Sequence, residues 1–81
     1  MTTKTKCFKL AKEHNLEIEY SILGKYDFHY SVNLPEGFQI DKWDDRQGLC
    51  SHAESKKELW QGIYGDLLEI ISYKPWLELK D

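Results

Sequence analysis

The side chains that bind metal ions most readily in this sequence are two cysteines and three histidines. Cys50 and His52 form the only close pair, while Cys7, His14 and His29 lie elsewhere in the chain. Structural zinc sites use four ligands, which usually come as two close pairs. The sequence therefore predicts no metal site and no cofactor. Because the two cysteines form no CxxC motif, we also expect reduced thiols and a cytoplasmic protein.

Carboxylates that could serve as a general acid and base occur at Glu17 and Glu19, which share a strand face, and at the adjacent Asp44 and Asp45. Acid–base catalysis needs such groups in a pocket that changes their protonation. A chain of 81 residues rarely forms a deep pocket, and no nucleophile–base–orienter set or glycine-rich phosphate loop is visible. We therefore expect a protein without enzymatic activity.

Lysines are the residues that could bind phosphate groups. If the predicted fold is right, five of them could form one basic face: Lys9, Lys12, Lys25, Lys56 and Lys57. The formal net charge of −3 argues against a general nucleic-acid binder, which is normally basic. Two interpretations of the lysines therefore stay open, a phosphate-binding face and an ordinary solvated surface.

Aromatic residues make up 14% of the chain, more than a small domain can bury. Trp43 should point away from the face that Phe38 and Ile40 share, and Trp76 lies beyond the last helix. Exposed aromatic residues are enriched at association surfaces. We therefore expect binding to a protein partner or to a second copy of the chain, as in a homodimer. The expected interface residues are Trp43, Trp76, Leu77 and Leu79. The alternative is a tail that folds back over its own core.

The longest element that could position these residues is a helix over 51–72. Leu59, Ile63, Leu67 and Ile70 recur at three- and four-residue steps, which places them on one helical face. Either Ser51 with Glu54 or Ser55 with Glu58 fits a capping box at its start, and Pro75 prevents its continuation. Two interior glycines, at 62 and 65, indicate a close approach to another element or a kink.

A shorter helix, capped by Thr3 or Thr5, should run to His14 and end at Asn15. Alternating apolar residues then predict strands over 16–22 and 26–34. A three-residue loop or a bulge would keep both apolar faces on one side, with Ile22 opposite Tyr26, Tyr20 opposite Phe28, Ile18 opposite Tyr30 and Glu19 opposite His29.

A turn at 35–37 predicts a third strand from Phe38 to about Trp43, and residues 44–50 then form a polar loop. The order predicts an α+β fold of the type α-β-β-β-α. In it, a three-stranded antiparallel meander carries two helices on its one apolar face. The length fits a single domain over 1–81, with a core at about 4–73 and a C-terminal extension at 74–81.

Two short motifs add a family resemblance. Lys9-Leu10-Ala11-Lys12, followed by Asn15-Leu16, resembles the end of the first helix of the double-stranded RNA-binding domain, and Tyr20 lies where that family often has an aromatic residue. Ser55-Lys56-Lys57-Glu58 resembles the start of its second helix. The resemblance implies the same α-β-β-β-α fold. It also implies that Lys56 and Lys57 contact phosphates of duplex RNA.

No apolar run approaches the roughly 20 residues that span a bilayer, and the N-terminus lacks the apolar core of a signal peptide. We therefore expect neither membrane insertion nor export. The first functional hypothesis is a small, non-catalytic protein that acts by protein association. The alternative is a divergent double-stranded-RNA-binding-like module.

Overall fold

The fold is seen in a computed structural model, which describes residues 2–41, 43 and 46–79. Its elements in chain order are helix α1 (Thr3–His14), strands β1 (Glu17–Gly24), β2 (Asp27–Asn33), β3 (Phe38–Gln39) and β4 (Gly48–Ala53), helix α2 (Lys56–Ser72) and strand β5 (Leu77–Glu78).

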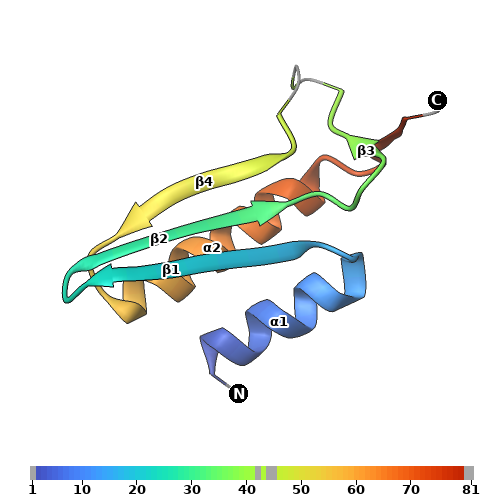
Figure 1. The fold of residues 1–81 in the computed structure, drawn as a ribbon. Helices are drawn as coiled ribbons and strands as arrows, with labels where there is room; N and C mark the ends of the chain where they lie inside the picture. Colours follow the sequence, from blue (N-terminus) through green and yellow to red (C-terminus); the bar gives the residue numbers. More distant parts are fainter. Residues whose placement is uncertain (1, 42, 44–45, 80–81) are drawn as a thin grey trace.

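Strands β1, β2 and β4 form an antiparallel sheet in that order, and both helices pack against one of its faces (Figure 1). A second, two-stranded sheet pairs β3 with β5. The other face of the larger sheet carries polar side chains. The predicted α+β class, with two helices on a three-stranded antiparallel sheet, is therefore confirmed.

Helix α2 supplies the centre of the hydrophobic core. Its predicted apolar stripe is buried almost completely, at Leu59, Ile63, Leu67 and Ile70. Strand β2 lies against this stripe with four alternate residues that are also buried, as the sequence predicts: Phe28, Tyr30, Val32 and Leu34. The helical and strand periodicities therefore meet at one continuous core.

Side chains and one left-handed residue define the helix ends. The Ser55 hydroxyl accepts a hydrogen bond from the Glu58 N–H at 3.1 Å, and the Glu58 carboxylate accepts one from the Glu54 N–H at 3.1 Å. Of the two predicted starts, α2 therefore uses the later. Thr2, rather than Thr3 or Thr5, caps α1, and Asn15 ends it with φ 58°, the left-handed conformation that the sequence predicts.

The turn between β1 and β2 differs from the predicted three-residue loop. Gly24 lies opposite Asp27, so the turn contains only Lys25 and Tyr26, and the register shifts between Ile22 and Gly24. This irregularity at Leu23 corresponds to the bulge that was the alternative prediction. Ile22 consequently lies opposite Phe28 rather than Tyr26, and the other predicted pairs are wrong by two residues. Tyr26 is exposed in the turn.

The third strand of the sheet is also a different segment from the one predicted. Among the described residues of this segment, 38–41 and 43, none pairs with β2, and Phe38 and Gln39 pair with Glu78 and Leu77 instead. The partner of β2 is β4, with Leu49 opposite Val32. The last three residues of the predicted polar loop and the first three of the predicted long helix are therefore strand.

Gly48 explains part of this choice. A Cβ atom at this position would lie 2.8 Å from the Cα of Asn33 and 2.5 Å from its Oδ1. The backbone of β4 thus begins so close to β2 that no Cβ atom fits between them, and only glycine can occupy position 48. The apolar pattern of residues 38–43 carries no such information about close approach.

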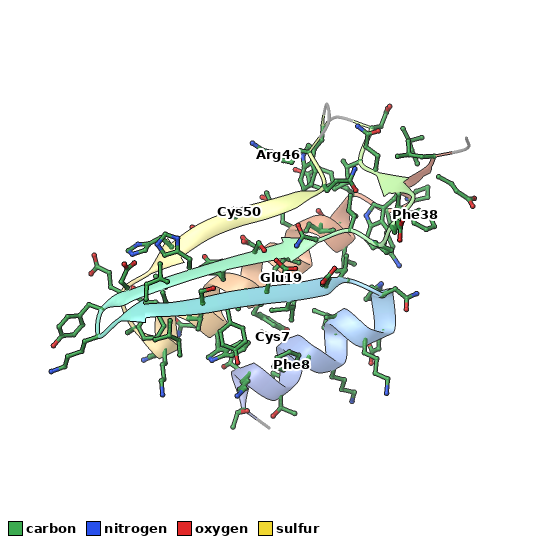
Figure 2. All side chains as sticks on the ribbon, in the orientation of Figure 1. Cys7, Phe8, Glu19, Phe38, Arg46 and Cys50 are labelled. Atoms are coloured by element: carbon green, nitrogen blue, oxygen red, sulfur yellow. The ribbon has the colours of Figure 1, made fainter. Side chains whose placement is uncertain are left out.

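The two cysteines should react at very different rates with a thiol reagent. Cys7 is fully buried on α1, where its thiol lies 3.5 Å from the Trp60 carbonyl of α2, and burial raises the pKa of this thiol to about 11. Cys50 is exposed on β4 (Figure 2). Because the thiolate is the reactive form, we expect one fast-reacting thiol per folded chain and two after denaturation. Cys50→Ser should remove the fast phase; a fast phase that survives this change would contradict the burial of Cys7.

Candidate interaction surface

The largest group of exposed apolar side chains lies where β1 turns into β2. We call Tyr20, Ile22, Leu23 and Tyr26 the hairpin patch. Ile22, Leu23 and Tyr26 are 58%, 63% and 67% exposed. The bulge at Leu23 and the two-residue turn cause this exposure, since they carry the end of the hairpin beyond the helices that cover the sheet (Figure 1). Apolar patches of this kind commonly mark association surfaces.

Aromatic rings extend the hairpin patch toward the helices. The ring centroid of Trp60 lies 5.1 Å from that of Tyr20 and 5.5 Å from that of Phe8. The Lys4 ammonium lies 5.5 Å from the Trp60 ring. Figure 2 shows Phe8 on α1, on the side of β1 away from β2. The hairpin patch is thus continuous with an aromatic cluster of Tyr20, Trp60 and Phe8.

Strand β1 also has a free edge. The sheet order places β1 outermost, and among the residues that the structure describes no strand pairs with its outer side. Natural edge strands are usually short, or protected by lysine, proline or a bulge. This edge has eight residues without lysine or proline, and its bulge lies only at the end, at Leu23. Its free backbone groups can therefore pair with another strand.

The residues expected from the sequence to form an interface lie at the opposite end of the molecule (Figure 1). Trp76 packs on the core and donates its indole N–H to the Ile70 carbonyl at 2.9 Å. The Trp43 ring lies 6.0 Å from that of Tyr73. Leu77 and Leu79 are each 47% exposed. The tail thus docks on its own chain, and its role as an interface stays a prediction.

The predicted lysines are distributed over several places. Lys56 and Lys57 line one hollow together with Lys4 and Trp60. Lys9 lines another, with Lys6, Leu10, Glu13 and Tyr64. Lys12 lies in the last turn of α1, and the Lys25 ammonium lies over the Tyr26 ring. Of the five predicted lysines, Lys56 and Lys57 therefore line the same hollow, while Lys9 lines a different one.

The fold groups the cysteines and histidines differently from their spacing in the sequence. Cys7 is in the core, and His14 lies beside Lys74. His29 and His52 come together with Asp27 on the open face of the sheet. The sequence pattern missed this cluster because β4 was not expected beside β2. The signal that could have found it is the outward position of both histidines on strands.

Comparisons with protein-family models, with curated proteins and with solved structures found no match. Within residues 2–41, 43 and 46–79, neither helix has the length and apolar character that a bilayer-spanning segment requires.

Proposed function

We propose that this chain is a small, non-catalytic interaction protein and that a second copy of itself is its partner. The proposal rests on one observation: the free β1 edge ends in the exposed hairpin patch. Apolar surface gains about 25 cal/mol per Å² when it leaves water, and strand pairing satisfies the free backbone groups of the edge. Both gains are available to a partner that adds a strand to β1.

The sequence of β1 favours a second copy as that partner. Antiparallel pairing of two β1 edges about Ile22 places Ile22 of one copy opposite Ile22 of the other. It also brings Glu19 of each copy to the end of the other hairpin, where Lys25 lies in the turn, so that acidic and basic side chains flank an apolar centre. A twofold interface needs such self-complementarity.

The shape of the molecule permits this pairing. Figure 1 shows that the hairpin extends past the N-terminal end of α1. A second copy paired about Ile22 would have its own α1 on the far side of the hairpin, so the two α1 helices avoid each other. Pairing that involved the start of β1 would bring both helices together.

Amide hydrogen exchange at increasing protein concentration tests which edge is used. We expect slower exchange in residues 19–24 of β1 as the concentration rises, because the added strand protects their N–H groups. Residues 48–53 of β4, the other edge, should exchange at the same rate throughout. Protection confined to β4 or to residues 76–79 would contradict the proposal.

A second candidate function is duplex RNA binding by a divergent module related to the double-stranded RNA-binding domain. It is supported by the α-β-β-β-α-like order and by Lys4, Lys56 and Lys57 around one hollow. Lysines at the end of a helix contact phosphates through charge rather than base identity. The nearby Glu54 and Glu58 oppose this attraction.

If this second function is real, duplex RNA should bind at low salt, and Lys56→Glu with Lys57→Glu should remove the binding. Each lost phosphate contact should reduce the slope of log affinity against log salt by about 0.9. Lys74→Glu, at the other end of α2, is the matched control. Absence of binding to wild-type protein at low salt would exclude this function.

A further inference from the structure

Three metal-ligating side chains converge on the open face of the sheet. Asp27 and His29 are two residues apart on β2, so they project on the same side. His52 is the partner of His29 across the β2–β4 pair. The ligand atoms of these three side chains all lie within 4.8 Å of one another. We call Asp27, His29 and His52 the open-face triad.

The distances fit one small ion. Asp27 Oδ1 lies 3.1 Å from His29 Nε2 and 3.0 Å from His52 Nε2. Zinc binds such atoms at about 2.0–2.2 Å, so two ligands of a tetrahedral ion are roughly 3.3 Å apart. The two Asp–His separations are within a few tenths of an ångström of this value, and all three ligand atoms lie within 4.8 Å of one another. Rotation of the half-exposed imidazoles would place one ion between the three atoms. The imidazole rings already meet edge to face, with centroids 5.1 Å apart.

In the described part of the chain, the ion-pair partners of the Asp27 carboxylate are His29 and His52. Within the described part of the chain, no lysine or arginine forms an ion pair with Asp27. The nearest charged neighbour in sequence, Lys25, turns its ammonium over the Tyr26 ring. Exposed Cys50 shares the face, but it is two strand residues from His52, about 7 Å along the strand. It therefore lies too far away to join the same ion without rearrangement.

We propose that the open-face triad is a binding site for a divalent transition-metal ion, with zinc as the ion it fits. Two imidazoles and one carboxylate occupy three positions, and water takes the fourth because the side chains are about half exposed. Sets of three protein ligands with an open position bind zinc in many proteins. The site does not depend on self-association, since all its ligands come from one chain.

Zinc titration of metal-stripped, reduced protein, with a competing chromophoric chelator, tests the site. We expect one ion per chain with a Kd on the order of 1–10 µM, weaker than a four-ligand structural site. His29→Ala or His52→Ala should each weaken binding at least about tenfold, because each removes one of the three ligands. His14→Ala is the matched control and should leave the affinity unchanged.

Two further measurements identify the ligands. Cys50→Ser should keep the affinity, because its sulfur is outside the triad. Long-range ¹H–¹⁵N spectra should show zinc-dependent shifts at Nε2 of His29 and His52 and none at His14. The proposal is overturned if zinc binds equally well to His29→Ala and His52→Ala, if binding disappears in Cys50→Ser, or if no zinc binds below about 100 µM. Circular dichroism of each variant confirms that it is folded.

Discussion

Gly62→Ala should destabilise the protein, although alanine favours a helix. A Cβ atom at this position would lie 2.7 Å from Cζ of Tyr30, closer than real Cβ contacts. Tyr30 is buried, so its ring cannot move away into solvent. Overpacking of a core costs about 1–3 kcal/mol, while the helix propensity gains about 0.8–1 kcal/mol. We expect a net loss of up to about 2 kcal/mol, which corresponds to a decrease of up to roughly 16 °C in Tm.

Gly65→Ala, three residues along the same helix, is the matched control. Nothing lies within 4 Å of a Cβ atom there. The substitution should therefore stabilise the protein by about 0.8–1 kcal/mol, as measured by urea unfolding. Equal effects of the two substitutions would show that α2 does not approach Tyr30 at Gly62. From the sequence, either a close approach to another element or a kink could explain the two glycines. In the structure, Gly62 allows α2 to lie close to Tyr30.

Ile22→Lys should abolish self-association. Ile22 lies at the centre of the proposed twofold interface, so each dimer would bring two lysines face to face in place of an apolar pair. A loss of about 2 kcal/mol per copy, the scale of an interface hot spot, would weaken the dimer roughly a thousandfold. The fold should be unaffected because the side chain is mostly exposed in the single chain.

Two controls separate the proposed interface from a general effect of charge. Leu77→Lys places the same charge on an exposed leucine in the tail and should leave the dimer intact. Lys25→Glu should weaken the dimer by bringing this glutamate near Glu19 of the second copy. Combining Lys25→Glu with Glu19→Lys should restore association. If Leu77→Lys dissociates the protein and Ile22→Lys does not, the tail is the interface.

Side-chain periodicity was sufficient to predict the two helices, the first two strands and the part of the core that α2 and β2 form. The alternation of apolar residues on β2 and their three- and four-residue spacing on α2 each depend only on local geometry. The apolar residues of both elements are buried in the same core. The residues that end or begin the helices, such as Asn15 and Ser55, also act through local interactions. These parts of the fold can therefore be predicted without knowledge of tertiary contacts.

Strand pairing was not predictable in the same way. Residues 38–43 and 48–53 both follow β2 and both contain apolar residues, so the choice between them depends on how closely each backbone approaches β2. Gly48 makes this approach sterically possible, but a glycine in a polar segment also fits a loop. The open-face triad could not be predicted either, because its third member, His52, belongs to β4.

The hairpin patch was missed because alternation assigns Tyr20, Ile22 and Tyr26 to the core. Alternation identifies the face of a strand but not how far the helices extend over it. The hairpin extends past the N-terminal end of α1 (Figure 1), and Ile22 and Leu23 near the end of β1 are exposed. The relative lengths of α1 and β1, rather than the apolar pattern of either element, determine this surface.

Sedimentation velocity of the wild-type protein, from about 1 to 500 µM, tests self-association most directly. We predict a sedimentation coefficient that rises with concentration from that of one chain to that of two, and a constant single-chain value for Ile22→Lys over the same range. A wild-type protein that sediments as one chain at every concentration would contradict the proposed function.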